Sequence, residues 1–483
     1  MLKASFERTH PALAEQVRQT DDPVHLIGIG GIGMAGLAGL LAGRGFFVTG
    51  SDLLKNTQTD WLARCGVCVY GGHSAQQVGE GVKWAVRSTA VPMDQVEVRA
   101  CLERGIPVYQ RGEVLAALTQ RMPSIAVSGT HGKTTTTALI AHVLEHAGRR
   151  PGYFVGGERH DHPVADWGDG ELIVLEADES DGTLSRYEPE TAVMTNLEYD
   201  HMEHFASRED LEECFRQFLS SARKRIIYCG DDAGARRVGR DFLQALTYGF
   251  SEGCYLKADE CRDEPGRLSF QMIGRAGAYG TVIMPLHGRH NALNALAAFL
   301  VVSEYGVSFE AFREALAVYR PVLRRYEQCG RWRGAEVISD YAHHPTALRA
   351  VMQMALVGRT GGRIQVIFQP HRYTRTLALK TEFIHAFDGA HSLLLCPVYA
   401  ASESPILGGT SRDLLEVLPV FPGGTRLVDS PAQAWDEMQV NLAPGDTLLI
   451  LGAGDVDTIA RGLRYDEYFD KSNCKKDDDE ETV

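Results

Sequence analysis

The sequence Ser-Gly-Thr-His-Gly-Lys-Thr-Thr-Thr at residues 128–136 decides the fold around it. The apolar run at 125–127 is typical of a buried strand, and apolar residues at helical spacing follow from 138 to 144. A glycine loop between strand and helix gathers backbone N–H groups and a positive helix end, which favours phosphate. Lys133 would reach the β- and γ-phosphates, and a threonine hydroxyl would hold Mg²⁺. The residues expected at this site are Gly129, Thr130, His131, Gly132, Lys133, Thr134 and Thr135.

This loop is shorter than the usual phosphate-binding pattern. Two residues separate Gly129 from Gly132, whereas the common pattern has four. The alternative is a glycine turn that precedes Lys-Thr by coincidence. The strand before the loop and the helix after it favour a phosphate site.

Length and composition bound the class of protein. A chain of 483 residues should hold about three domains. Its formal net charge of −14 argues against nucleic acid as a partner. The first residues do not resemble a signal peptide, and no run reaches the ~18 apolar residues of a membrane span, so we expect a cytoplasmic protein without a membrane segment. Cys65 and Cys68 form the only close cysteine pair, and we expect two buried thiols there rather than a metal or redox site.

A second glycine-rich loop lies near the start of the chain. Gly-Ile-Gly-Gly-Ile-Gly at 28–33 follows an apolar strand at 24–27 and leads into a helix. Gly28 would allow a tight turn, Gly30 would let a diphosphate approach, and Gly33 would let the helix pack on the strand. Asp52 follows the next strand, where such folds bind a ribose hydroxyl. From these residues alone, an NAD site and a glycine turn without a ligand both stay open.

Acidic residues follow the next two strands of the central region. Glu-Ala-Asp-Glu-Ser-Asp at 176–181 comes after a buried strand at 172–175 and suits Mg²⁺, although an acidic surface loop is the alternative. The strand at 192–195 ends in Asn-Leu-Glu-Tyr-Asp-His at 196–201. Its acidic residues and His201 either join the same site or are structural.

The rest of the central region is expected to form a helix capped by Ser207, a hairpin from 268 to 283, and a helix that opens at 287–294. His290 and Asn291 stand at the start of that last helix. They are either helix caps or adenine contacts, and the residues alone do not separate these alternatives.

The last third of the chain repeats the strand-then-polar pattern. A strand at 337–339 leads to Asp340, and a helix begins near Pro345. The buried strand at 364–368 leads to Gln-Pro-His-Arg-Tyr-Thr-Arg-Thr at 369–376, which predicts an anion site, with a solvated basic turn as the alternative. Strands at 393–395 and 448–451 complete another parallel sheet.

These patterns predict an α/β fold of three domains. A Rossmann-like parallel sheet occupies 1–121, a P-loop ATPase-like α/β domain with a small antiparallel hairpin occupies 122–325, and a Rossmann-like domain occupies 326–463. Residues 464–483 form an acidic tail that we expect to be disordered.

The motifs together resemble the Mur ligase family over residues 24–463. The resemblance rests on seven stretches in family order: GIGGIGMAG at 28–36, GTHGKTTT at 129–136, EADESD at 176–181, TNLEYDHM at 195–202, GRHNALN at 288–294, DYAHHPT at 340–346 and QPHRYTRT at 369–376.

The resemblance implies a reaction. It implies ATP- and Mg²⁺-dependent joining of L-alanine to the lactyl carboxylate of UDP-N-acetylmuramate, in cytoplasmic peptidoglycan synthesis, through an acyl phosphate. It makes the first glycine loop a UDP-sugar site rather than an NAD site. It also implies three domains that close on ATP and expel water from the acyl phosphate.

The resemblance also implies residue roles. Lys133 would neutralise the transferring phosphate, Thr134 would ligate one Mg²⁺, and Glu179 and His201 would hold a second. His290 and Asn291 would contact adenine, and Arg325 and Asp340 would lie near the ATP phosphates and ribose. The residues implied to bind the sugar nucleotide and alanine are Gly28, Gly30, Gly31, Gly33, Ser51, Asp52, Ser88, His343, His371, Arg372 and Arg375. Among these, Arg375 would bind the carboxylate of alanine.

Two details qualify the transfer of roles. Related ligases of later steps carry a carbamylated lysine after the Asp-His motif, and the helix at 211–219 has no lysine, which agrees with alanine addition. Glu176 and Glu179 lie so close together that either could be the metal ligand.

Other functions remain as alternatives. A recycling ligase that attaches a ready-made tripeptide to the same sugar nucleotide would lack the HRYTR pattern at 371–375. An NAD-dependent oxidoreductase would leave the Lys133 loop unexplained, and a silent nucleotide-binding regulator would not need Lys133, Glu179 and His201 together. The sequence leaves monomer and dimer open.

Overall fold

The structure is a computed structural model that describes residues 11–465, except 161, 201–203, 360 and 402. The chain packs into two compact units. The first unit holds the residues up to Val322 except 263–266. The second unit holds the residues from Leu323 onward together with 263–266.

The first sheet of the first unit is fully parallel, in the order β3-β2-β1-β4-β5. Its strand order reverses at β1, so the loop after β1 lies at the switch point where such sheets bind ligands. The strands are β1 (Val24–Ile27), β2 (Val48–Asp52), β3 (Cys68–Gly71), β4 (Trp84–Arg87) and β5 (Val108–Gln110). The helices are α1 (Pro11–Gln16), α2 (Ile32–Arg44), α3 (Thr57–Arg64), α4 (Val96–Glu103) and α5 (Arg111–Thr119), with a short 3₁₀ turn η1 (Ala75–Gln77).

The central sheet has ten strands in the order β15-β14-β13-β12-β11-β10-β6-β9-β7-β8. Strand β6 lies parallel between β10 and β9, so the loops after these three strands meet at one sheet edge. The strands are β6 (Ser124–Ser128), β7 (Gly152–Phe154), β8 (Ala165–Asp166), β9 (Ile173–Glu176), β10 (Thr191–Met194), β11 (Arg225–Cys229), β12 (Leu246–Gly249), β13 (Leu256–Glu264), β14 (Arg267–Gly274) and β15 (Gly277–Met284). Strands β14 and β15 form the antiparallel hairpin expected from the sequence.

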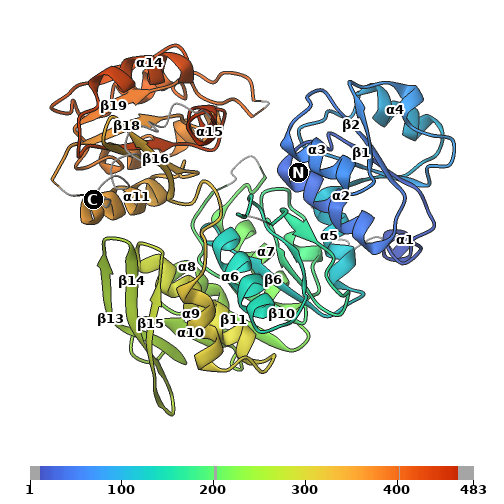
Figure 1. Ribbon diagram of the computed structural model, residues 1–483. Coiled ribbons are helices and arrows are strands. Elements are labelled where there is room, and N and C mark those ends of the chain that lie inside the picture. Colours follow the sequence, from blue (N-terminus) through green and yellow to red (C-terminus); the bar gives the residue numbers. More distant parts are fainter. Residues whose placement is uncertain (1–10, 161, 201–203, 360, 402, 466–483) are drawn as a thin grey trace, which may run out of the picture. The chain divides into compact units, whose positions relative to one another are not determined.

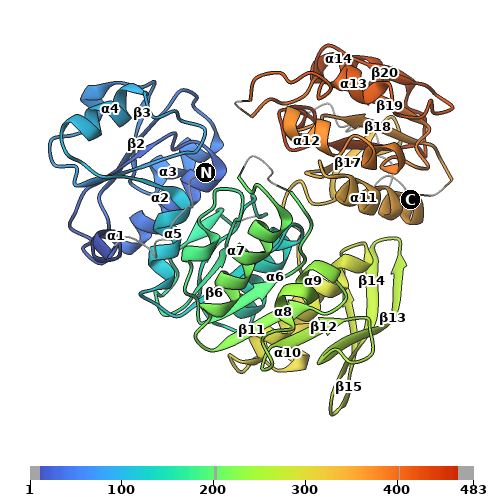
Figure 2. The same cartoon turned by 180° about the vertical axis from the view of Figure 1, so that it is seen from behind.

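Helices cover both faces of the central sheet. On one face α6 (Lys133–His146), α9 (Arg289–Ser303) and α10 (Phe309–Ala317) pack on the side chains of Val127, Val174 and Val193. Figure 1 shows α6 and α9 side by side. On the other face, seen in Figure 2, lie α7 (Arg208–Ser220) and α8 (Ala233–Gly239). A 3₁₀ turn, η2 (Leu184–Arg186), adjoins α7.

Glycines on α2 let the first sheet pack closely against the central one. A Cβ at Gly36 would lie 2.8 Å from Phe154 Cε2, and a Cβ at Gly43 would lie 2.9 Å from Trp167 Cβ. These two glycines are seven residues apart and share one helix face. Their missing side chains admit the ring of Phe154 and the Cβ of Trp167, and one continuous hydrophobic core joins both sheets.

The second unit holds a six-stranded sheet in the order β16-β17-β21-β18-β19-β20. The strands are β16 (Glu327–Trp332), β17 (Ala335–Asp340), β18 (Ile364–Phe368), β19 (Ser392–Leu395), β20 (Thr425–Leu427) and β21 (Thr447–Leu451). Around them lie α11 (Pro345–Gly358), α12 (Tyr373–Ala378), η3 (Glu382–His385), α13 (Ser411–Leu415), α14 (Pro431–Asn441) and α15 (Asp457–Tyr465). Buried side chains alternate between two cores, as expected for a sheet covered on both faces.

The structure corrects two expectations. The third sheet is not wholly parallel, because β16 runs antiparallel to β17 at one edge. Cys65 and Cys68 are exposed rather than buried, because they flank a turn between α3 and β3 at the surface. The three α/β sheets and the helix capped by Ser207 are as expected, and Ser207 Oγ accepts a hydrogen bond from Asp210 N.

Other expectations stay open. His201 lies outside the described residues, as does the predicted tail except for the last residues of α15. The predicted domain boundaries stay a prediction. In the part of the chain that the structure describes, no helix is both long and apolar enough to cross a bilayer.

We expect Gly36→Leu to lower the free energy of unfolding by about 1–3 kcal/mol, because the new side chain would overpack the core against Phe154. Gly81→Leu is the matched control, since the nearest atom to a Cβ there is 3.9 Å away, in Pro23. Urea unfolding of both variants measures the difference. Equal stability of the two variants would show that α2 does not depend on this close approach.

Candidate phosphate and substrate sites

The glycine loop after β6 is held in shape by the end of β10. His131 N donates a hydrogen bond to Asn196 Oδ1 (2.8 Å), and Asn196 Nδ2 donates one to His131 O (2.9 Å). Thr195 Oγ1 also donates to His131 O (2.6 Å), and Glu198 N donates to Thr130 Oγ1 (2.9 Å). The loop is therefore fixed on both sides of His131 before any ligand arrives.

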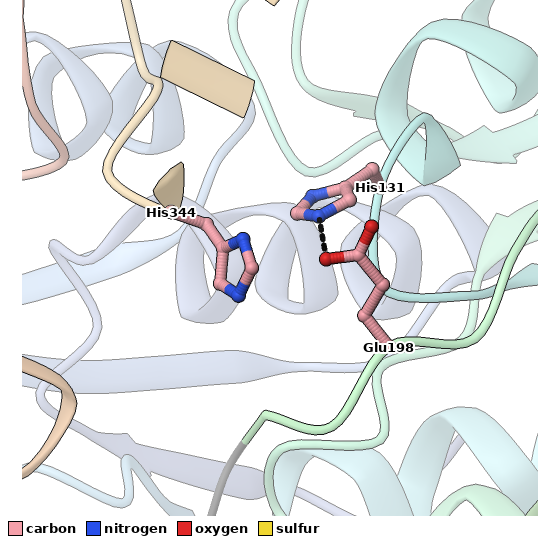
Figure 3. Close-up of side chains that lie close together, drawn as sticks. All are labelled: His131, Glu198 and His344. Atoms are coloured by element: carbon pink, nitrogen blue, oxygen red, sulfur yellow. Dashed lines mark ion pairs between the residues drawn. The ribbon is translucent and has the colours of Figure 1, made fainter. Parts of the chain in front are cut away.

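The imidazole of His131 also pairs with a carboxylate of this segment. Its Nε2 lies 3.6 Å from Glu198 Oε2, and Figure 3 shows this ion pair. His131 lies in the loop and Glu198 follows β10, so the pair adds a contact between the loop and the strand end. His344, also labelled in Figure 3, belongs to the second unit and caps α11, where its side chain accepts a hydrogen bond from Thr346 N.

The loop needs glycine at two positions for different steric reasons. Gly129 has φ +133°, and a Cβ there would overlap Thr195 Oγ1. Gly132 has φ +81°, and a Cβ there would lie 2.7 Å from Asn294 Oδ1. Asn294, on α9, also accepts a hydrogen bond from Thr136 Oγ1 (3.2 Å). Close packing by two neighbouring elements thus explains the glycines at these two positions.

The amine of Lys133 joins the loop to the acidic segment after β9. Lys133 Nζ lies 3.0 and 2.9 Å from the two oxygens of Glu179 and 2.7 Å from Gly129 O. Burial lowers the pKa of Lys133, but the carboxylates of Glu179, Asp178 and Glu176 outweigh it and raise the pKa above its ordinary value. The amine is therefore positive at neutral pH and placed to bind an anion.

The donor set at this edge fits Mg²⁺. Glu179 and Thr134 are buried oxygen-bearing residues at the loop, and Asp178 and Glu176 add carboxylates. Hard cations such as Mg²⁺ prefer oxygen ligands of this kind. Glu176 Oε2 already accepts a hydrogen bond from Gly156 N (2.9 Å), whereas Glu179 faces Lys133. This arrangement favours Glu179 over Glu176 as the residue nearer the phosphate loop.

The start of α9 contains both residues expected to contact adenine. His290 is exposed there. Asn291 is buried; its Nδ2 donates to His287 O (2.6 Å), and its Oδ1 accepts from Asn294 Nδ2 (2.9 Å). Asn291 therefore acts as part of the network that links α9 to the loop. Its contact with adenine stays a prediction.

The first glycine loop is clamped by two side chains. Asp52 Oδ2 accepts a hydrogen bond from Gly30 N (2.8 Å), and Asn56 Nδ2 donates one to Gly30 O (3.1 Å). A Cβ at Gly30 would lie 2.9 Å from Asp52 Oδ2, so the position requires glycine. Gly28 has φ +79° and lies close to Ser88 Cβ. Asp52 thus shapes the loop, and its expected contact with a ribose hydroxyl stays a prediction.

Behind this loop lies a buried polar network centred on Glu97. Ser51 Oγ donates to Glu97 Oε2 (2.5 Å), His25 Nε2 lies 3.2 Å from the same oxygen, and Ser74 N donates to Oε1 (3.0 Å). His73 Nδ1 lies 3.0 Å from Ser51 Oγ. Ser51 is fully buried, and its carbonyl accepts hydrogen bonds from the first two N–H groups of the loop. Glu97 therefore supports the loop through Ser51.

The basic segment after β18 forms a cluster in the second unit. Arg375 Nη1 lies 3.3 Å from His371 Nδ1, and the His371 ring stacks on Tyr399 with centroids 5.6 Å apart. The His343 ring lies 5.4 Å from that of His371. Arg372 has φ +69°, and its Nη1 lies 3.5 Å from Glu403 Oε1. The structure thus brings His343, His371 and Arg375 together, whereas the guanidinium of Arg372 pairs with Glu403.

Residues at the start of the second unit form a separate group around Tyr341. The guanidinium carbons of Arg324 and Arg325 lie 4.8 and 5.1 Å from the centre of the Tyr341 ring. Asp340 is buried and accepts hydrogen bonds from Tyr326 N and Ala342 N, each 2.7 Å long. Burial raises the pKa of Asp340 even though Arg325 opposes the shift. Asp340 anchors this turn, and its contact with ATP stays a prediction.

Sequence reasoning missed several residues that shape these sites. Asn196 and Asn56 clamp the two glycine loops, Glu97 lies in a helix, and Tyr399 stacks on His371 from a distant loop. Asn196 follows the end of a strand, and that position could have indicated that it is a site residue. The other three carry no local pattern, because their partners are distant in the chain.

A clamped glycine loop with a buried lysine, followed by an acidic strand end, defines a phosphate-loop α/β protein. Comparison with known proteins then gives the family. "Mur ligase middle domain" matches residues 127–302, "Mur ligase family, catalytic domain" matches 23–122, and "Mur ligase, glutamate ligase domain" matches 324–454. The chain belongs to the Mur ligase family.

Individual relatives are similar over nearly the whole chain. The UDP-N-acetylmuramate–L-alanine ligase of Carboxydothermus hydrogenoformans is 38% identical over 444 residues, which cover 91% of this chain and 96% of the relative. A ligase of the same name from an Anaeromyxobacter species is 40% identical over 440 residues, 90% of this chain and 95% of the relative.

Solved structures agree with this relationship. The crystal structure of UDP-N-acetylmuramate-alanine ligase from Thermotoga maritima matches with a TM-score of 0.78 and 26% identity, covering 91% of this chain and 98% of that one. A murein peptide ligase from Psychrobacter arcticus matches with a TM-score of 0.70 at 22% identity, covering 92% and 98%, and shares the fold. The predicted α/β fold class and the predicted family are thereby confirmed.

We expect Glu97→Gln to lower the free energy of unfolding at neutral pH by about 1–3 kcal/mol, because an amide nitrogen would face donors that now meet a carboxylate. Burial raises the pKa of Glu97, but hydrogen bonds from His25, Ser51 and Ser74 outweigh it and hold the pKa below the ordinary 4.5. This stabilisation is present above pH 4.5 and is lost as the pH falls through the lower pKa of the folded state.

Urea unfolding between about pH 7 and pH 3 measures both effects. The wild type should lose stability more steeply at the acid end than Glu97→Gln. Glu103→Gln, an exposed change on the same helix, should behave as the wild type. Identical acid slopes for all three proteins would rule out an ionised Glu97 as a support of the loop.

Proposed function

We propose that this chain joins L-alanine to the lactyl carboxylate of UDP-N-acetylmuramate, with ATP and Mg²⁺, in cytoplasmic peptidoglycan precursor synthesis. The observation that carries the proposal is the buried Lys133–Glu179 pair at the phosphate loop. The names of the full-length relatives supply the substrates. The reaction is a phosphoryl transfer followed by an acyl transfer.

In the first step a lactyl carboxylate oxygen attacks the γ-phosphorus of ATP, the bond to the bridging oxygen breaks, and ADP leaves. The product is an acyl phosphate. Lys133 is positive and sits at the loop, so it would neutralise charge on the transferring oxygens. The loop is already held by Thr195 and Asn196, so little reorganisation is needed.

Magnesium, held by Thr134 and Glu179 with His201, would supply further charge neutralisation when bound. In the structure Glu179 faces Lys133 at 2.9 Å. An incoming triphosphate would compete for the amine, which would leave the carboxylate of Glu179 for the cation. The same pair thus orients both groups at the loop.

In the second step the neutral amine of alanine attacks the acyl carbon, a tetrahedral intermediate forms, and phosphate leaves. The carboxylate of alanine needs a cation that does not itself react. Arg375 is 4% exposed and held against His371, so its guanidinium is pre-oriented for a carboxylate. We assign the carboxylate of alanine to Arg375, and further substrate contacts to His343, His371 and Arg372.

The remaining assignments concern the nucleotides. We assign the ATP phosphates to the loop residues 129–135 and to Arg325, the ribose to Asp340, and adenine to His290 and Asn291. The sugar nucleotide is assigned to the first glycine loop with Asp52 and Ser88.

We expect Lys133→Ala to abolish ligation and leave affinity for UDP-N-acetylmuramate within about two-fold of the wild type, because the two glycine loops bind different ligands. ADP release and a calorimetric titration with UDP-N-acetylmuramate measure the two properties. Lys224→Ala, which removes an exposed lysine paired with Glu190, should leave both unchanged. Loss of ligation and of sugar-nucleotide affinity together would contradict separate loops.

We expect ADP release to be fastest with L-alanine in a panel that also holds glycine, L-serine and the tripeptide. Discrimination against glycine and serine should be modest, because one methyl group or hydroxyl in a small pocket is worth about 1–3 kcal/mol. The tripeptide should be a poor substrate, because Arg375 and His371 favour a single amino acid. Preference for the tripeptide would assign the chain to recycling instead.

A further inference from the structure

Arg111 lies at the first position of α5 and contacts segments that follow two different strands. Its Nη2 lies 3.6 Å from Asp178 Oδ2 and 3.8 Å from Asp181 Oδ2, both in the acidic segment after β9. On its other side, a Cβ at Gly33 would overlap Arg111 Nη1. The guanidinium therefore rests on the backbone of the first glycine loop, in space that any side chain at position 33 would fill.

This contact gives Gly33, the last glycine of the motif, a different structural role. In the common fingerprint that glycine lets the helix pack on its strand. Here Gly33 instead admits a cation beside the loop. A cation near the first turn of a helix is electrostatically unfavourable, because that end already carries partial positive charge. Asp178 and Asp181 offset this cost, so the chain holds a guanidinium where a structural role alone would disfavour one.

The guanidinium also keeps donors for another anion. Its distances to Asp178 and Asp181 exceed the ~2.7–2.9 Å of a charge-assisted hydrogen bond. A guanidinium carries five N–H donors in a fixed fork, and the side chain is 27% exposed. The side chain of Asp181 is only 5% exposed, so it fixes the guanidinium from the protein side. Arg111 is thus oriented, charged and accessible.

We propose that Arg111 is a further substrate-binding residue, whose guanidinium binds the diphosphate of the sugar nucleotide at the first glycine loop, with Asp181 as its positioning residue. The inference rests on the proposed function, which places a sugar nucleotide at this loop. A diphosphate offers the tetrahedral oxygens that an arginine fork binds in pairs. A cation beside the loop would also offset the repulsion between the diphosphate and a chain of negative net charge.

The test compares the binding of three ligands to Arg111→Met, Arg111→Lys and the wild type by calorimetry. Loss of hydrogen bonds to a charged group predicts an approximately 10- to 100-fold weaker affinity of Arg111→Met for UDP-N-acetylmuramate. UDP alone should lose affinity by the same factor, since it carries the same diphosphate. Affinity for ATP should change less than three-fold, and Arg111→Lys should recover part of the loss.

Two further variants separate binding from structure. Arg99→Met removes an exposed arginine of α4 and should bind all three ligands as the wild type does. Asp181→Asn should weaken UDP binding and leave ATP binding unchanged, because it frees the guanidinium without removing it. Thermal unfolding of each variant shows whether it is folded before titration.

Each outcome decides the proposal. If Arg111→Met binds UDP and UDP-N-acetylmuramate as tightly as the wild type, Arg111 is not a ligand and the inference fails. If only UDP-N-acetylmuramate loses affinity, the guanidinium contacts the sugar or its carboxylate, and the diphosphate assignment is wrong. If ATP loses as much as UDP, Arg111 serves only the packing of the unit. If the wild type binds neither uridine compound, the proposed function itself fails.

Discussion

The ion pair between Lys133 and Glu179 is the contact on which the candidate phosphate site depends. It joins the glycine loop after β6 to the acidic segment after β9 across neighbouring parallel strands. Burial alone would lower the pKa of Lys133, and the neighbouring carboxylates, Glu179 foremost, raise it above its ordinary value. The cationic amine is thereby held at the glycine loop, as the proposed phosphoryl transfer requires.

Hydrogen bonds from neighbouring strands keep both glycine loops in shape. Asn196 holds the loop of Lys133 from the end of β10, and Asn56 holds Gly30 together with Asp52. In each case an amide side chain bonds to the backbone of the loop. Preformed loops lose little entropy on binding, which suits the proposed reaction between two anionic substrates.

The sequence is informative where the chemistry is local. Strand, glycines and Lys133 are adjacent in the chain, so the phosphate loop is recognisable from its residues alone. The sequence does not show that Asp52 bonds to Gly30, that Glu97 supports Ser51, or that Gly33 makes room for Arg111. Those contacts join residues 22 to 78 positions apart, and only the packing of strands and helices brings them together. The exposure of Cys65 and Cys68 has a different cause, a surface turn between α3 and β3.

The paired glycines on α2 have a consequence for which molecules could react. They let the helix that follows the first glycine loop pack closely on Phe154 of β7 and on Trp167, which follows β8. Under the proposed function, these contacts between bare backbone and the residues Phe154 and Trp167 constrain the distance between the two glycine loops. In that reaction, the distance from the diphosphate to the carboxylate of the sugar nucleotide must match the distance between the loops. Compounds whose diphosphate and carboxylate are closer together or farther apart would bind at one loop, and their carboxylate would not be placed at the other.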